Sequence, residues 1–337
     1  MNSGMNVAVV GATGAVGEAI LEILEQRRFP IKNIYPLGSP RSAGSTIIFN
    51  GRTLTVGVLD DFDFSVVDLS LFSAGASVSA EYAPKAVNSG SIVVDNTSNF
   101  RRDPDIPLIV PEVNLHALDQ HRGIIANPNC STIQMVVALK PIYDAVGIKR
   151  INVATYQAVS GAGKRAIGEL MAQSASILDG KPVQAEEFPT QIAFNAIPQI
   201  DIFQENGYTR EEMKIIWETK KIFEDETILI NPTAVRIPVF HGHSEAVHIE
   251  THAKITASQV RDLLSSAPGI KVIDERKPGG YPTPFTDAAN EDQVFVGRIR
   301  EDISCATGIN LWIVSDNIRK GAALNSIQIS EELLNRR

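Results

Sequence analysis

The sequence has few cysteines and no long apolar run. Only Cys130 and Cys305 occur among its 337 residues, which leaves no material for a disulfide framework or a multi-cysteine metal site. No stretch approaches the apolar length that a membrane span needs, and the first residues lack the pattern of a signal peptide. These absences favour a reducing compartment, so we expect a cytoplasmic protein without a membrane partner.

The chain also has fewer basic than acidic residues. The chain carries 31 Lys and Arg residues against 39 Asp and Glu residues, which gives a formal net charge of -8 at pH 7. Binding to a phosphate backbone needs a basic face, so this balance argues against a nucleic-acid partner. A hydrophobic content of 44% over this length predicts a large core divided between two domains.

A glycine-rich turn follows a short β-branched segment near the start. Residues 5–10 predict a strand, and the run G-A-T-G-A-V-G at 11–17 leads directly into a helix with one apolar face. Glycines there permit a tight turn and let backbone N–H groups approach a pyrophosphate. The spacing differs from the usual G-x-G-x-x-G, so the motif alone also fits a merely tight turn. The residues assigned to cofactor binding are Gly11, Thr13, Gly14, Ala15 and Val16.

The end of the second expected strand lacks the acidic residue that would hold the ribose of NAD. Residues 34–42 contain no carboxylate there, and Ser39, Arg41 and Ser42 offer hydroxyl donors and a cation instead. Such groups suit a 2′-phosphate, which favours NADP. The alternative is that Arg41 is an ordinary solvated loop residue.

The remaining pattern predicts two α/β units. Further short strands are expected at 53–58, 68–75, 91–95, 108–110 and 123–126, with a helix at 78–87. This alternation is typical of a Rossmann-like, doubly wound parallel sheet. Beyond it we expect strands at 150–158 and 235–252 and helices at 164–178, 210–223 and 320–334. We therefore predict an NADP-binding domain at 1–129, a second α+β catalytic and dimerisation domain at 130–316, and a C-terminal helix at 317–337 that returns to the first domain.

Cys130 lies where a backbone can activate a thiol. The tetrad Pro-Asn-Cys-Ser at 128–131 opens a run with helical spacing, so the thiol should sit near a helix N-terminus, whose N–H groups and dipole stabilise a thiolate. Ligands bind beyond the carboxyl ends of strands in such sheets, so we expect the thiol near the cofactor crevice. The alternative is a buried cysteine that acts as a small hydrophobe.

A nucleophilic cysteine needs an acid or base partner, and histidine suits that task near neutral pH. The six histidines are His116, His121, His241, His243, His248 and His252. His243 is favoured because Arg236 precedes it and Gly242 permits a bend. Arg236 and His243 are an odd number of positions apart, so both can face one pocket only if Pro238 and Gly242 interrupt the strand. The His-x-His pair at 241–243 lacks a third ligand with supporting spacing, so no metal is predicted.

Six motifs occur along the chain in a characteristic order. They are G-A-T-G-A-V-G, N-P-N-C-S-T, Y-Q-A-V-S-G-A-G, E-E-M-K, R-I-P-V-F-H-G-H-S-E and S-D-N-I-R-K-G-A-A. Together they resemble the bacterial aspartate-semialdehyde dehydrogenases from end to end. The resemblance implies NADPH-dependent reduction of aspartyl phosphate to aspartate semialdehyde and phosphate, the branch point toward lysine, methionine, threonine and isoleucine. It also implies a homodimer.

The resemblance also implies a role for each matching residue. Cys130 would be the acyl-thioester nucleophile, His243 the general acid/base and Gln157 the residue that orients the reacting group. Arg236 would pair with the substrate carboxylate. Arg101 and Lys214 would hold the phosphate and Glu211 the amino group. Ser160, Gly161 and Asn317 would lie near the nicotinamide, where some members place a glutamine instead of Asn317. From the chemistry alone, Asn129 is a candidate to assist backbone N–H groups in stabilising an oxyanion.

Two rival functions stay open at this point. An N-acetylglutamyl-phosphate reductase would share the architecture and the thioester chemistry, but its cysteine turn usually carries a glycine before the cysteine and an aromatic residue after it. This chain has Asn129 and Ser131 there. The other rival is a non-catalytic NADP-binding dimer scaffold, which would tolerate the loss of Cys130.

Overall fold

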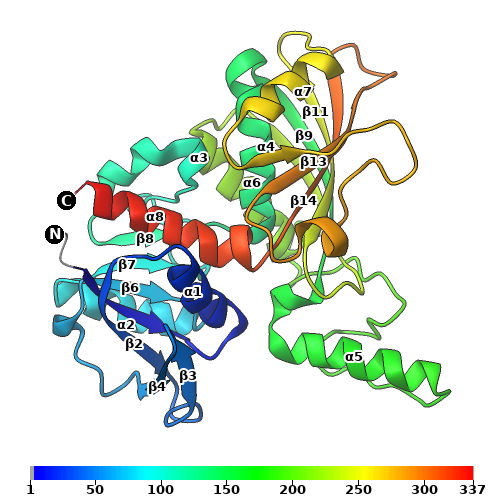
Figure 1. The fold of residues 1–337 in the computed structure, drawn as a ribbon. Coiled ribbons are helices and arrows are strands. Elements are labelled where there is room, and N and C mark those ends of the chain that lie inside the picture. Colours follow the sequence, from blue (N-terminus) through cyan, green and yellow to red (C-terminus); the bar gives the residue numbers. More distant parts are fainter. Residues whose placement is uncertain (1–3, 337) are drawn as a thin grey trace. The chain divides into compact units, whose positions relative to one another are not determined.

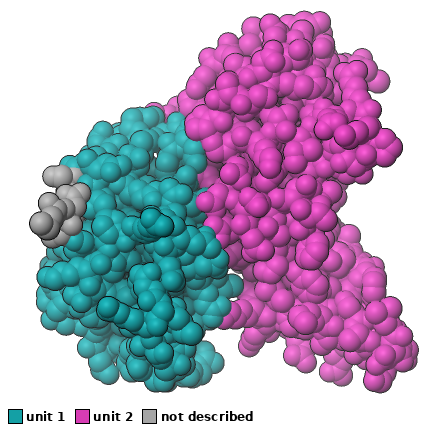
Figure 2. Space-filling model, viewed as in Figure 1, with its two compact units in different colours: residues 1–129, 322–337 teal, residues 130–321 magenta. Residues whose placement is uncertain are grey.

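The computed structural model describes residues 4–336 and divides the chain into two compact units (Figures 1 and 2). The first unit runs to Asn129 and resumes at Ala322, and the second is Cys130–Gly321. The second unit extends beyond residue 316 because Asn317 contacts Ser160 and Gly242 of that unit, and Arg319 pairs with Asp292. Among the described residues, every helix falls short of the length and apolar character that crossing a membrane demands.

A six-stranded sheet whose strand pairs are all parallel forms the centre of the first unit. Its order is β5-β2-β1-β6-β7-β8, and the bounds are β1 (Met5–Val10), β2 (Ile31–Gly38), β5 (Gly57–Val58), β6 (Leu69–Phe72), β7 (Ile92–Asp95) and β8 (Ile124–Ala126). Its helices are α1 (Ala15–Gln26), α2 (Ala76–Asn88), α3 (Pro111–Asn114) and α8 (Leu324–Asn335). The strand order reverses beside β1, which confirms the predicted doubly wound, Rossmann-like sheet.

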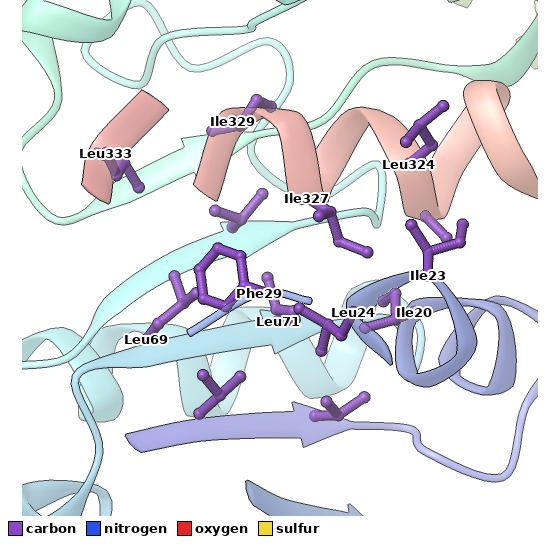
Figure 3. Packing of buried hydrophobic residues seen from close by; sticks show 14 of the residues in the cluster. Ile20, Ile23, Leu24, Phe29, Leu69, Leu71, Leu324, Ile327, Ile329 and Leu333 are labelled. Atoms are coloured by element: carbon purple, nitrogen blue, oxygen red, sulfur yellow. The ribbon is translucent and has the colours of Figure 1, made fainter. Parts of the chain in front are cut away.

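The C-terminal helix belongs to the core of the first unit. Leu324 and Ile327 of α8 pack in one buried cluster with Ile20 and Leu24 of α1 and with Leu71 of β6 (Figure 3). Residues three apart share one face of a helix, so a single side of α8 supplies this contact. The C-terminal helix thereby completes the hydrophobic core of the first unit.

Two of the expected strands in the first unit differ from the structure. Residues 53–58 divide between β4 (Arg52–Thr55), which pairs with β3 (Thr46–Phe49) in a separate two-stranded sheet, and the two-residue strand β5. Leu108 makes only an isolated bridge to Ala126. Residues 108–110 do not form a strand because two prolines flank them. Pro107 lacks an N–H and Pro111 begins α3, so the segment between them is too short for a ladder of hydrogen bonds.

A mixed six-stranded sheet forms the second unit, in the order β10-β9-β11-β14-β13-β12. The strands are β9 (Ile148–Gln157), β10 (Leu229–Arg236), β11 (His243–Thr251), β12 (Ile270–Val272), β13 (Val294–Glu301) and β14 (Gly308–Ser315). The helices are α4 (Cys130–Val146), α5 (Lys164–Leu178), α6 (Arg210–Phe223) and α7 (Ala257–Ser266). Helix α4 packs against β9, β11, β13 and β14, so the predicted α+β character of this unit is confirmed.

The long extended run expected at 235–252 is interrupted. β10 ends at Arg236, β11 begins at His243, and the segment between them contains Pro238 and Gly242. Gly242 has φ +87, and a Cβ there would lie 2.7 Å from the carbonyl oxygen of Pro284. Only glycine fits such a position. The interruption that a shared pocket for Arg236 and His243 requires is therefore present.

Candidate active site

Three neighbouring strand ends bring Arg236, Gln157 and His243 into one row. β9 lies between β10 and β11, and Arg236 pairs with Gln157 in the parallel register. On the other side Ser244 pairs with Tyr156, which places His243 beside Gln157. The side chains of Gln157 and His243 meet at 3.3 Å. Arg236, Gln157 and His243 are 6%, 1% and 0% exposed, so the row is almost closed to water.

Cys130 is the first residue of helix α4, as the sequence pattern predicts. The helix dipole at this end favours a negative charge on sulfur. A Cβ at Gly321 would approach Cys130 Cβ to 2.8 Å, so a side chain at position 321 would crowd Cys130. A charge on Cys130 also acts on the pKa of Arg236, which places the thiol within electrostatic range of the row.

His243 is held by the backbone of Ala158. The Ala158 N–H donates to Nδ1 at 3.0 Å, so the proton of the neutral ring is on Nε2. Nε2 lies 3.3 Å from Gln157 Nε2, which is also a donor, so this contact is a close approach and not a hydrogen bond. Burial and, to a smaller extent, the charge of Arg236 lower the pKa of His243 to about 3, although the charge of Glu211 acts in the opposite direction. The substrate-free site therefore contains a neutral imidazole with its Nε2–H directed at the row.

Glu211 and Lys214 extend the row from helix α6. Glu211 accepts from Gln157 Nε2 at 3.1 Å and from Lys214 Nζ at 3.0 Å, and Lys214 also contacts Asp201 at 3.0 Å. Burial works to lower the pKa of Lys214, but Glu211 and Asp201 raise it, and the net shift is upward. The charged form of Lys214 is therefore favoured. Thr209 caps α6 and thereby fixes the turn that carries Glu211.

Arg236 shares its anchor with His243. Its Nη1 donates to the carbonyl oxygen of Ala158 at 2.7 Å, while the N–H of the same residue bonds to His243. Burial lowers the pKa of Arg236, and the charges of Glu211 and Cys130 oppose that shift. One peptide segment therefore orients both side chains.

The residues expected near the nicotinamide lie close to this row. Asn317 accepts from the Gly242 N–H at 3.0 Å and donates to Ser160 Oγ at 3.0 Å. A Cβ at Gly161 would lie 3.2 Å from Arg236 Nη1 and 3.3 Å from His243 Nε2. Gly161 thus borders the row without filling it.

The glycine turn of the first unit has the form of a phosphate cradle. Gly11 has φ +88, and a Cβ at Gly17 would come within 2.1 Å of the Gly11 carbonyl oxygen. Gly14 precedes α1, and no described side chain caps that end of the helix. The N–H groups at Ala15 and Val16 therefore begin a helix suited to an anion, which fits the pyrophosphate of a dinucleotide.

The expected 2′-phosphate loop follows β2 directly. Ser42 donates its backbone N–H to the carbonyl oxygen of Ser39 at 2.9 Å, and the two hydroxyl oxygens lie 3.4 Å apart. Arg41 is exposed between them. One cation beside two hydroxyl groups at the end of the second strand is a donor set that fits a phosphate.

Arg101 and Asn129, the other candidate ligands, belong to the first unit. Arg101 donates from Nε to the carbonyl oxygen of Asn127 at 2.9 Å and from Nη2 to that of Asn96 at 2.8 Å. Both Arg101 and Asn129 are buried. The guanidinium is therefore held in one orientation before any ligand arrives.

Three residues that contact the candidate site were not predicted from the sequence. Asp201 lies in an irregular segment with no periodic signal, and Ala158 acts through its backbone alone. Thr155 donates to Gln157 Oε1 at 3.1 Å; its position two residues before Gln157 on one strand was a usable signal. His241 is partly buried and gains no role. Among the described residues, no group of three or more His, Cys, Asp or Glu side chains is arranged to hold a metal.

Comparison with known proteins agrees with this geometry. Residues 6–121 match the model of the semialdehyde dehydrogenase NAD binding domain, and residues 139–320 match that of the semialdehyde dehydrogenase dimerisation domain. The aspartate-semialdehyde dehydrogenase of Legionella pneumophila is 62% identical over 99% of this chain and 96% of its own length. The Bacillus subtilis enzyme of that name is 52% identical over 99% of this chain and 98% of its own.

Solved structures give the same answer. The crystal structure of aspartate semialdehyde dehydrogenase II of Vibrio cholerae complexed with ASA is 57% identical and covers 98% of both chains, with a TM-score of 0.97. The Candida albicans aspartate semialdehyde dehydrogenase with NADP is 26% identical, again with 98% coverage of both chains, and has a TM-score of 0.77. This chain belongs to the aspartate-semialdehyde dehydrogenase family.

Proposed function

We propose that this chain reduces L-aspartyl-4-phosphate to L-aspartate 4-semialdehyde, with release of phosphate, through a thioester on Cys130. The observation that carries the proposal is the row of Arg236, Gln157 and His243, almost closed to water, with a cysteine at a helix start in electrostatic range. This is a nucleophile, an imidazole and a carboxylate receptor in one unit. The step leads toward lysine, methionine, threonine and isoleucine.

The first chemical step forms the thioester. The sulfur of Cys130 attacks the acyl carbon, a C–S bond forms, and the bond between that carbon and the phosphate oxygen breaks. Phosphate leaves with the proton that the thiol gives up. The N-terminal end of α4 stabilises the thiolate, and Asn129, which directly precedes Cys130, is the side-chain candidate beside the developing oxyanion.

The second step reduces the thioester. When bound, NADPH supplies the hydride for the carbonyl carbon. His243 directs Nε2–H at the oxygen that becomes negative, and an anionic substrate raises the pKa of the ring, so that Nε2 serves as the acid/base atom. The C–S bond then breaks, the aldehyde leaves and the thiol of Cys130 is restored.

Substrate recognition needs local cations because the chain is acidic overall. Arg236 is assigned to the substrate carboxylate, which a guanidinium binds in a bidentate manner. Glu211 is assigned to the amino group, and Lys214 and Arg101 to the phosphate. Gln157 orients the reacting group, since Thr155 and Glu211 fix both ends of its amide.

The cofactor is NADP. Gly11, Thr13, Gly14, Ala15 and Val16 are assigned to its pyrophosphate, and Ser39, Arg41 and Ser42 to its 2′-phosphate. Ser160, Gly161 and Asn317 are assigned to the nicotinamide end. The capless start of α1 and the exposed cation after β2 support this division.

The expected assembly is a homodimer formed through the second unit. Residues 139–320 match a dimerisation domain. The face of β11 turned away from α4 carries the exposed Ala246, and one open sheet face suits an isologous contact. We place the reaction in the cytoplasm, because a chain with only two cysteines fits a reducing compartment.

The reverse assay tests the proposal. Aspartate semialdehyde, phosphate and NADP should give an increase in nicotinamide absorbance that depends on all three components. N-acetylglutamate semialdehyde in place of aspartate semialdehyde tests the reductase alternative, and we expect no turnover with it. Turnover only with the acetylated substrate would favour that alternative, and no turnover with either would favour the non-catalytic scaffold.

A further inference from the structure

Glu245 is a buried carboxyl that takes no part in the chemistry described so far. It lies two residues after His243 on β11, so both side chains point to the same face of the sheet. Its side chain is 1% exposed, and its two carboxyl oxygens have no hydrogen-bond partner among the described residues. Burial raises the pKa of Glu245 well above the ordinary value of 4.5. Burial therefore favours the uncharged form of this carboxyl.

Gln134 occupies the matching position on the helix. It follows Cys130 by one turn of α4, so the two side chains lie on the same side of the helix. Gln134 is fully buried, and neither atom of its amide has a hydrogen-bond partner of good geometry in the described chain. It is nevertheless the side chain whose hydrogen bonding acts on the pKa of Glu245. The two groups are thus close neighbours that fall short of full hydrogen-bond geometry.

We propose that Gln134 and Glu245 form a positioning pair that sets the separation of Cys130 and His243. Helix α4 packs directly on β11, and the pair lies one turn and two strand residues deeper than the thiol and the imidazole. An uncharged carboxyl and a carboxamide each offer a donor and an acceptor, so they can pair through hydrogen bonds when the helix and the strand hold them at the right separation. The proposal rests on the proposed function, because it concerns the same thiol and imidazole.

Two neighbours of Glu245 explain why its place matters. Thr155 lies directly across from it on β9, and the Thr155 hydroxyl donates to Gln157. Ile313 lies across from it on β14. A shift of Glu245 therefore reaches Gln157 as well as His243. An apolar pair would pack at least as well, so a polar pair at this depth is better explained by specificity of register than by stability.

Substitutions on both sides of the pair test it. In Glu245→Leu and in Gln134→Leu we expect kcat to fall about tenfold to a hundredfold with little change in KM, because small misplacements of reacting groups have effects of this size. Glu245→Gln keeps a neutral group with a donor and an acceptor, so we expect kcat within about threefold of wild type. The double variant should lose no more than either single Leu variant.

A second readout needs no substrate. In a Cys305→Ser background, the rate of alkylation of Cys130 by iodoacetamide at fixed pH reports the surroundings of the thiol. We expect it to change in both Leu variants and to return with Glu245→Gln. Because no semialdehyde is used, this result stands apart from the reverse assay, and a failure of the proposed function is distinguishable from a failure of the pair.

The matched control is Gln173→Leu. Gln173, on α5, is another buried carboxamide of the second unit, and its Oε1 accepts from the backbone N–H groups of Ile192 and Ala193. We expect this variant to lose stability but to keep both kcat and the alkylation rate. The proposal is overturned if Gln134→Leu keeps wild-type kcat and alkylation, or if Glu245→Gln is as impaired as Glu245→Leu.

Discussion

The backbone N–H of Ala158 donates to Nδ1 of His243 at 3.0 Å, and this contact fixes the tautomer of the ring. Burial lowers the pKa of His243 to about 3, so the ring should stay neutral in the free enzyme from about pH 5 to pH 8. We expect ¹⁵N NMR of the substrate-free protein to show a protonated Nε2 and an unprotonated Nδ1 throughout this range. A ring that titrates near pH 6.5 would contradict this assignment.

Arg236 tests how substrate binding and catalysis are linked. Arg236→Leu removes the proposed partner of the substrate carboxylate, and we expect KM to rise roughly tenfold or more, as for the loss of a charged hydrogen bond. Arg236 Nη1 also holds the Ala158 carbonyl, whose peptide segment orients His243. We therefore expect a smaller decrease in kcat as well. Steady-state kinetics with varied semialdehyde give both values, and an unaltered KM counts against the role.

Arg41 tests the preference for NADP. It is exposed after β2, between two serines that lie side by side. Arg41→Ala should raise the KM for NADP about tenfold while that for NAD stays nearly constant, because only NADP carries the 2′-phosphate. Lys32→Ala, at an exposed position near the start of β2, is the control and should affect neither. Equal losses with both cofactors would show that Arg41 does not read the phosphate.

Glu245 makes a prediction about stability and pH. Its pKa is raised in the folded state, so between pH 4.5 and the raised pKa the folded chain binds more protons than the unfolded chain. This contribution to stability is present below pH 4.5 and is lost as the pH rises. Glu245→Gln lacks that titration, so it should be more stable than wild type above pH 4.5, by about 1.4 kcal/mol per pH unit until the raised pKa is reached. Urea unfolding of both proteins at several pH values measures the difference, and a difference that is independent of pH would contradict the prediction.

The sequence predicts most of the helices and the residues of the row. Helical spacing after Cys130 and the strand-turn-helix context of Gly11 are local signals, and the structure has both elements where the patterns place them. The order of the motifs also brought Gln157, Arg236 and His243 into one proposed site. Nearby sequence is enough to predict a feature that depends only on the helix or strand in which the residue lies.

The order of strands in a sheet cannot be predicted from such local signals, because it depends on the topology of the whole unit. Because Arg236 and His243 are an odd number of residues apart, the strand between them must be interrupted if both face one pocket. Nothing in that segment indicates that β9 lies between β10 and β11. The same non-local order gives Ala158 its two contacts, to Arg236 and to His243. A backbone contact carries no residue signature, so no reading of the sequence identifies it.

Acylation of Cys130 tests the central claim most directly. The protein is mixed with aspartate semialdehyde and NADP without phosphate, quenched with acid, and analysed by mass spectrometry of its peptides. We expect about one reduced nicotinamide per active site and an aspartyl group on the peptide of Cys130, and neither in Cys130→Ala, which should still bind NADP. Nicotinamide reduction without any modified Cys130, or full turnover by the alanine variant, would contradict the account.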